Sequence, residues 1–147
     1  MFFYRDKADK IIDSFTGEYA FLSNFYDAPV IYNGLKYKNN EAAFQAQKLE
    51  HNMDRRQFTD LPPNEAKRLG RKVLLRDGWD NIRLTEMFGI VLAKFRQNPE
   101  LAKKLVDTGD AYLEEGNWWN DKYWGVCNGE GRNMLGKILM VIRGEFQ

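Results

Sequence analysis

The segment from residue 30 to residue 53 reads VIYNGLKYKNNEAAFQAQKLEHNM and contains two patterns in succession. In its first third, two short apolar runs flank the dipeptide Asn33-Gly34. Asn and Gly tolerate the positive φ angles of a type I′ turn, so this part predicts a β-hairpin. The residues that follow the hairpin have helical spacing.

This second part predicts a helix over about residues 40–53, with Asn40 as its N-cap and Glu41 in its first turn. The spacing i, i+4, i+7 and i+11 gives the helix one apolar stripe. That stripe consists of Ala42, Ala46, Leu49 and Met53. About a right angle away lies a polar stripe of Glu41, Gln45 and Lys48.

The rest of the chain predicts short strands and turns before this segment and mainly helices after it. The aromatic segment 19–26 alternates in part, which favours strands. Periodicity and capping residues predict further helices at 65–69 (capped by Asn64), 77–97, 99–105 and from about 133, with a short strand at 111–113. The expected fold class is α+β, a single compact, helix-dominated domain over residues 1–147 with short N-terminal strands and a β-hairpin.

Composition excludes several classes of protein. The 147 residues are 44% hydrophobic and 29% charged, which excludes intrinsic disorder. The net charge of +1 argues against a strongly basic nucleic-acid-binding protein. The single Cys127 forms no internal disulfide, so a reducing, cytoplasmic location is expected. The single His51 argues against a histidine-based zinc site, and no apolar run is long enough for a membrane span.

Three tryptophans, Trp118, Trp119 and Trp124, lie close together in the sequence among amide side chains and Asp121. Rings and polar groups together are typical of a pocket wall on which a base or sugar stacks. A packed loop explains the same cluster equally well.

A glycine-rich loop over 125–133 leads into the last predicted helix. Backbone N–H groups at such a junction favour a phosphate, although a turn with a helix cap is the alternative. The spacing from Gly131 to Lys137 matches a P-loop, but Ile138 replaces the Ser or Thr that binds magnesium, so no ATPase is predicted.

The polar stripe of Glu41, Gln45 and Lys48 provides an acid or base, an orienting amide and a cation. A solvated helix flank is the alternative. Two other groups are expected to carry no chemistry: the acidic residues 107–115 as a solvated turn, and Cys127 as a buried, inert thiol.

Seven sets of residues form a larger pattern that follows in order over nearly the whole chain. They are 17–25, 40–48, 70–79, 87–95, 108–115, 121–125 and 131–143. Together they resemble the NADAR family, also called the YbiA-like family. The resemblance implies a compact, mostly helical α+β domain with N-glycosidase activity. Members of the family act on phosphorylated ribosylaminouracil intermediates of riboflavin synthesis, and related members remove ADP-ribose from modified guanine.

The resemblance also implies roles for single residues. Glu41, Lys48, Trp79 and Asp121 lie on the family's motif positions, whereas Ala42-Ala43 departs from the His-Tyr of many relatives. Cleavage of a glycosylamine develops positive charge at the anomeric carbon, which carboxylates stabilise. We therefore expect Glu41 to act as general acid/base, and Asp121 as electrostatic stabiliser or water activator. Lys48 is expected to act as a cation or a nucleophile.

The remaining expectations concern binding. Trp79 and Trp124 are expected to stack on the base. Further substrate contacts are expected from Asn24, Gln45, Gly125, Gly131 and Asn133. The expected partner is a small ribosyl or ADP-ribosyl molecule. Nucleic acid is expected only as an ADP-ribosylated substrate. No metal or redox cofactor is expected. Alternative functions are an ADP-ribosyl-guanine hydrolase and a non-catalytic module that binds ADP-ribose-type ligands.

Overall fold

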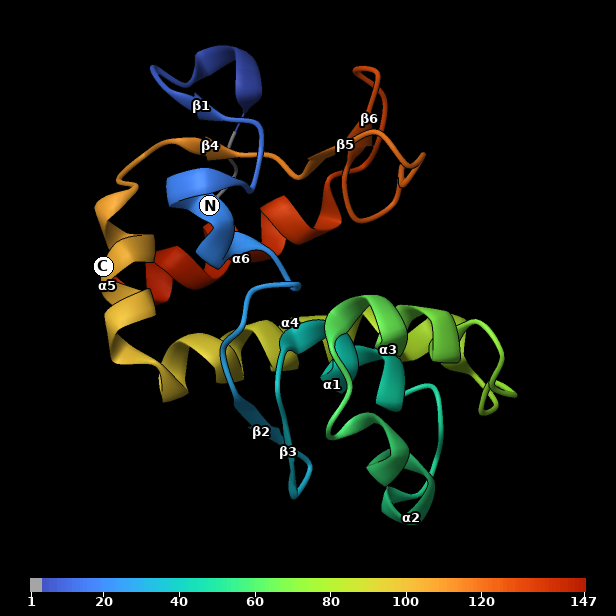
Figure 1. The fold of residues 1–147 in the computed structure, drawn as a ribbon. Helices are drawn as coiled ribbons and strands as arrows, with labels where there is room; N and C mark the ends of the chain where they lie inside the picture. The colour runs from blue at the N-terminus through green and yellow to red at the C-terminus, as the bar shows by residue number, and fades with distance from the viewer. Residues whose placement is uncertain (1–3) are drawn as a thin grey trace. The chain divides into compact units, whose positions relative to one another are not determined.

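The computed structural model describes residues 4–147 and separates them into two compact units (Figure 1). Unit 2 is Asn24–Asn98, and unit 1 combines the residues up to Ser23 with Pro99–Gln147. The expected α+β class with a majority of helix is confirmed, whereas the expected single domain over 1–147 stays a prediction. No helix within residues 4–147 has the length and apolar character of a membrane span.

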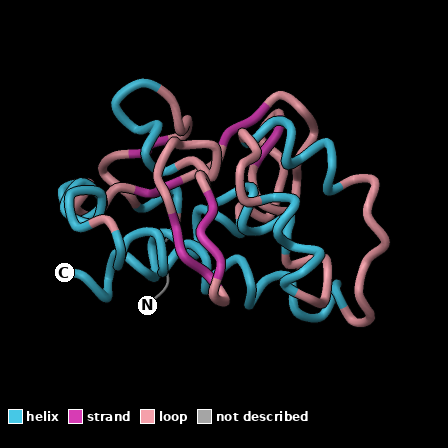
Figure 2. The backbone as a smooth tube through the Cα atoms, turned by 60° about the horizontal axis from the view of Figure 1, so that its bottom comes forward, coloured by secondary structure: helices cyan, strands magenta, loops and turns pink. Residues whose placement is uncertain are grey.

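Unit 2 contains the predicted hairpin. Strand β2 (Val30–Tyr32) pairs antiparallel with β3 (Leu35–Tyr37), and the two strands lie side by side in Figure 2. The turn residues have φ angles of 49° at Asn33 and 84° at Gly34, as a type I′ turn requires. The hairpin prediction is therefore confirmed.

Helix α1 (Asn40–Ala46) follows the hairpin but differs from its prediction at both ends. Its N-cap is Asn39, whose Oδ1 accepts a hydrogen bond from the Ala42 N–H at 2.8 Å, so the prediction of Asn40 as cap was wrong by one residue. Asn39 and Asn40 are adjacent and both are favourable N-cap residues, so the sequence alone did not distinguish between them.

Helix α1 ends at Ala46, seven residues before its predicted end at Met53. The backbone carbonyls that follow this end accept hydrogen bonds from residues outside the helix. The Lys48 carbonyl accepts from the Arg76 N–H at 2.8 Å, and the Leu49 carbonyl accepts from Arg55 Nε at 3.0 Å. A separate short helix, α2 (Asn52–Arg55), follows. Met53 is 83% exposed, so its predicted place on an apolar stripe was wrong.

The remaining helices of unit 2 pack against α1. They are η3 (Arg56–Phe58), α3 (Pro63–Gly70) and α4 (Trp79–Gln97). Helix α1 contacts α3, α4 and η3, and β2 contacts α4. The predicted core stripe of α4 is buried at Met87, Val91 and Phe95, but Leu84 is exposed. Helix α4 begins two residues later than predicted, after Gly78 in a left-handed conformation.

Unit 1 contains the two ends of the chain. After η1 (Arg5–Lys7), strand β1 (Ile11–Ile12) pairs in parallel with β4 (Tyr112–Leu113). The strand expected in 19–26 is instead the 3₁₀ helix η2 (Gly17–Leu22) over its first half. Local turn bonds, such as Ser23 N–H to the Ala20 carbonyl at 3.0 Å, satisfy its backbone without a partner strand.

The C-terminal half of unit 1 holds two helices and a second parallel strand pair. Helices α5 (Pro99–Asp107) and α6 (Met134–Phe146) contact each other, and β5 (Gly116–Asn117) pairs with β6 (Val126–Cys127). Both helices and the buried Cys127 were predicted. The fully buried Arg143 of α6 donates to the Ala111 carbonyl at 2.8 Å.

Candidate functional site

Two of the predicted catalytic side chains lie together at α1 in unit 2, next to an amide that orients one of them. Gln45 Nε2 donates a hydrogen bond of 2.8 Å to Glu41 Oε2, one helical turn away. Gln45 is 6% exposed, so the amide that holds the carboxylate is itself fixed by packing. Glu41 is thus an oriented, partly exposed carboxylate.

Lys48 stays close to Glu41 although the helix ends before it. Its Nζ donates to the Gly70 carbonyl at 3.1 Å. Burial lowers the pKa of Lys48 below its ordinary value, and the positive charge of Arg71 acts in the same direction, while the negative charge of Glu41 opposes both. Lys48 lies beyond the end of α1, so the shared helical stripe was the wrong geometry, and joint action of Glu41 and Lys48 stays a prediction.

Gln45 also has a buried acceptor that is not used. No donor among residues 4–147 reaches its buried Oε1. A Cβ atom on Gly70 would overlap the Gln45 side-chain amide, so a larger residue at position 70 would displace the amide that holds Glu41. This Oε1 oxygen is buried against Gly70, and the expected substrate contact of Gln45 stays a prediction.

Asn24 lies beside the start of α1. Its side chain accepts from Asn40 Nδ2 at 3.4 Å and contacts the sulfur of Met87 at 3.4 Å. Its carbonyl accepts from the Glu41 N–H at 3.0 Å. These contacts make Asn24 a residue that positions the first turn of α1, and its expected substrate contact stays a prediction.

Trp79 is a core residue of unit 2. It is 6% exposed at the first turn of α4, and its ring lies 5.3 Å from that of Phe44, at an angle of 50°. Phe44 is on α1, so the Trp79 ring supports the helix that carries Glu41. Stacking of Trp79 on a substrate base stays a prediction.

We expect Trp79→Ala to lower the free energy of unfolding by about 3–5 kcal/mol, because it removes a buried ring and leaves a cavity. Urea denaturation followed by circular dichroism measures this loss. Trp79→Phe is the matched control and should retain most of the stability. If Trp79→Ala keeps its stability but loses ligand affinity, the ring stacks on substrate instead.

Asp121, the third predicted catalytic residue, lies in unit 1 and organises a loop. Its Oδ1 accepts from the backbone N–H groups of Tyr123 at 3.1 Å and Trp124 at 2.9 Å. The Asn117 side chain bonds the backbone of Asp121 twice: its Nδ2 donates to the Asp121 carbonyl, and its Oδ1 accepts from the Asp121 N–H. Trp124 packs edge-on against Tyr123 with ring centroids 4.7 Å apart. The contacts of Asp121 are those of a turn-forming carboxylate, and its catalytic role stays a prediction.

The other two tryptophans of this loop are exposed. Trp118 is 86% exposed and Trp119 is 44% exposed, with their rings edge to face at 5.5 Å. A packed loop therefore does not explain Trp118.

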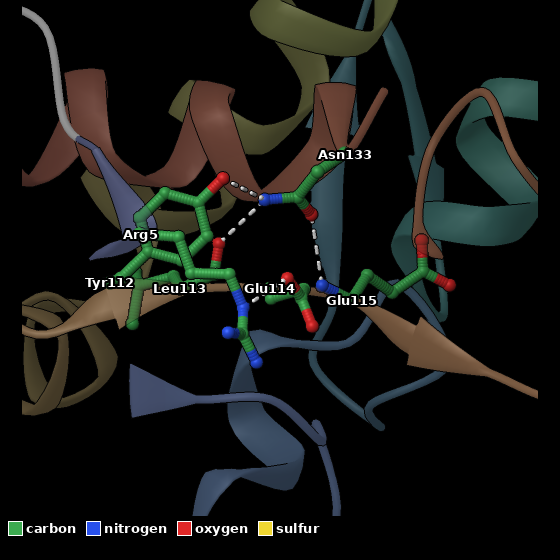
Figure 3. A network of polar contacts seen from close by, with 6 residues as sticks. All are labelled: Arg5, Tyr112, Leu113, Glu114, Glu115 and Asn133. Carbon is green, nitrogen blue, oxygen red and sulfur yellow. Dashed lines mark hydrogen bonds and ion pairs between the residues drawn. The ribbon is translucent and has the colours of Figure 1, made fainter. Parts of the chain in front are cut away.

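The loop from Gly125 to Asn133 is tied to β4 by a side-chain network (Figure 3). Asn133 is 2% exposed; its Nδ2 donates to the Leu113 carbonyl at 2.9 Å and to the Tyr112 hydroxyl at 3.3 Å. Its Oδ1 accepts from the Glu115 N–H at 3.0 Å. The amide of Asn133 thus fixes the start of α6, and substrate binding by it stays a prediction.

The predicted backbone phosphate site at this helix start is not formed. The N–H groups of Asn133, Met134 and Leu135 donate to the carbonyls of residues 125, 123 and 124. These are the groups that an anion at a helix N-terminus would use. A Cβ atom on Gly131 would overlap the Gly125 carbonyl oxygen, so Gly131 serves this close chain contact. Substrate contacts of Gly125 and Gly131 stay predictions.

Glu114 and Lys94 are charged residues whose burial the sequence patterns did not predict. Glu114 was expected in a solvated turn, but its side chain is 11% exposed and accepts a hydrogen bond from Arg5 Nε at 3.0 Å. Lys94 on α4 is 2% exposed, and burial lowers its pKa to about 7. The position of Glu114 directly after the apolar pair Tyr112–Leu113 was the available signal for its burial.

The comparison with known families covers both units. A model of the NADAR domain matches residues 2–147. The chain belongs to the NADAR family. This assignment covers essentially every element described above.

Individual relatives fall into two groups by length. The N-glycosidase YbiA of Escherichia coli (strain K12) is 36% identical over 144 residues, covering 94% of this chain and 89% of the relative. A riboflavin biosynthesis protein of Vibrio vulnificus is 37% identical over 133 residues, but the matched part is only 36% of that longer protein. The NMR structure of E. coli YbiA superposes with a TM-score of 0.82 at 35% identity, covering 94% of this chain and 85% of that one.

Proposed function

We propose that this chain is an N-glycosidase that hydrolyses the ribose C1–N bond of phosphorylated ribosylaminouracil intermediates of riboflavin synthesis. The similarity to the N-glycosidase YbiA over 94% of the chain supports the activity. The riboflavin biosynthesis protein of V. vulnificus supports the pathway. The single structural observation that carries the proposal is the Glu41 carboxylate held by Gln45 beside a lysine whose pKa is lowered.

Glu41 acts as the general acid and base of this reaction. As an acid it protonates the departing nitrogen, and as a base it takes a proton from the water that adds to C1. The positive charge that develops on the sugar favours a nearby carboxylate. Water adds to C1 and the C1–N bond breaks, so the products are a ribose phosphate and the free aminouracil.

Gln45 is a positioning residue in this scheme. Its Nε2 fixes the plane of the Glu41 carboxylate. Asp121 and Trp124, in unit 1, are proposed as stabiliser and base-stacking residue on the basis of the family motif alone. The proposed location of this chemistry is the cytoplasm.

The proposal is tested by incubating the purified chain with three compounds and detecting the free base by mass spectrometry. They are a phosphorylated ribosylaminouracil, ADP-ribosylated guanosine and a stable nucleoside such as uridine. We expect release of aminouracil from the first and no release from uridine. Release of guanine alone would establish an ADP-ribosyl-guanine hydrolase instead. Binding without any release would establish a non-catalytic module.

A further inference from the structure

Unit 1 contains a cavity of about 370 Å³, and all of its lining residues belong to this unit. Its walls come from η1, β4, the glycine-rich loop and the first turn of α6. A volume of this size lies in the range of small-molecule sites. Its polar side chains are Arg5, Glu114, Arg132, Asn133 and Lys137, together with the Tyr112 hydroxyl.

The charges around this cavity are unbalanced. Of its three cations, Arg5 is paired with Glu114 at 3.0 Å. Neither Arg132 nor Lys137 has an ion-pair partner within the described chain. Both lie at the start of α6, whose first turn contains no acidic residue. Since the helix dipole adds positive potential there, an anion is the group that these two cations favour.

Arg132 is held in place for such a contact. Its guanidinium lies 5.4 Å from the centre of the Tyr123 ring. The backbone N–H of Arg132 donates to the Lys122 carbonyl at 2.8 Å. An arginine that stacks on a ring keeps its N–H donors free for a planar or tetrahedral anion. Because the helix-start N–H groups are already bonded, side chains must supply the anion's donors at this site.

Glu114 brings the reverse chemistry to the lining of the cavity. Its side chain is nearly buried, and Arg5 Nε donates a hydrogen bond to its Oε1. A carboxylate in this position repels a phosphate but accepts hydrogen bonds from hydroxyl groups. Both polar side-chain atoms of Asn133 are already bonded within the protein (Figure 3), so the anion is assigned to Arg132 and Lys137 instead.

We infer that this cavity binds a sugar phosphate, with the phosphate on Arg132 and Lys137 and the sugar hydroxyls on Glu114. A phosphate monoester carries between one and two negative charges at neutral pH, which matches the two unpaired cations. The inference concerns binding in unit 1 and goes beyond the proposed hydrolysis. It holds for any sugar phosphate of suitable size, substrate or effector.

The test is calorimetric titration of the full chain with ribose 5-phosphate, inorganic phosphate and ribose. We expect saturable binding of ribose 5-phosphate, weaker binding of phosphate and none of ribose. Arg132→Gln and Lys137→Gln should each weaken ribose 5-phosphate about tenfold or more, since each removes a charge-assisted hydrogen bond. Lys103→Gln is the matched control, because Lys103 is an exposed lysine of α5 paired with Asp107 outside the cavity.

A second measurement locates the ligand directly. Amide NMR shifts of Gly129 and Gly131, which line the cavity, should move during the titration. No binding of ribose 5-phosphate, or equal affinity in the Arg132, Lys137 and Lys103 variants, would refute the inference. Base release by a chain that fails to bind here would refute the inference alone and leave the proposed hydrolysis standing.

Discussion

Glu41→Gln is expected to lower the rate of base release by about two to four orders of magnitude, the contribution of a typical general acid–base group. The substitution keeps the size of the side chain, and the new amide still has an oxygen that accepts from Gln45 Nε2. The substitution removes the titratable carboxyl group and its negative charge. The free energy of unfolding should therefore stay close to that of the parent chain.

Glu50→Gln is the matched control for this experiment. Glu50 is a nearby glutamate whose side chain is 71% exposed. Its substitution should change neither the rate nor the stability, because an exposed carboxylate contributes little to either. Single-turnover assays with saturating enzyme separate the chemical step from product release. A Glu41→Gln rate near that of the parent would remove Glu41 from the chemistry.

The local parts of the fold were predictable because they depend on neighbouring residues. Asn33-Gly34 specifies its turn through backbone preferences alone, and the structure confirms the hairpin. The Glu41–Gln45 contact follows from the four-residue spacing of a single helical turn. No long-range information was needed for either feature.

The end of α1 was not predictable for the opposite reason. Residues 47–53 contain no Gly or Pro to stop a helix, so the sequence favours its continuation. The carbonyls of Lys48 and Leu49 instead bond to Arg76 and Arg55, residues whose positions depend on tertiary packing. That same early ending places the Lys48 amine against the Gly70 carbonyl, a geometry that a continuous helix does not specify.

Burial of charge was the second feature that sequence patterns missed. Charged residues usually face solvent, which is why Glu114 was assigned to a solvated turn. Its partner Arg5 is 109 residues away in the sequence, so no local spacing reveals the pair. The phosphate site was likewise expected from backbone groups, whereas the cations of the unit 1 cavity lie on side chains.

Lys48 has two competing expected roles, a fixed cation and a nucleophile. A nucleophilic role requires a neutral amine, and burial together with the charge of Arg71 lowers the pKa of Lys48 toward that state. The amine can then attack C1 of the ring-opened imine, and Glu41 protonates the departing nitrogen. The aminouracil leaves, and a Schiff base joins Lys48 to the sugar until water adds to C1 and releases ribose phosphate.

We expect borohydride added during turnover to inactivate the chain, with a reduced sugar phosphate attached to the Lys48 peptide. Lys48→Ala should lower the rate at least about a hundredfold, comparable to the loss of an acid–base group. Lys48→Arg keeps the charge but supplies no neutral amine, so it should be equally inactive. In the parent chain, kcat/KM should rise as pH increases through the lowered pKa of Lys48, because only the deprotonated amine attacks. An unmodified Lys48 peptide, together with rescue by arginine, would instead assign Lys48 the role of a fixed cation that holds a phosphate or a sugar hydroxyl.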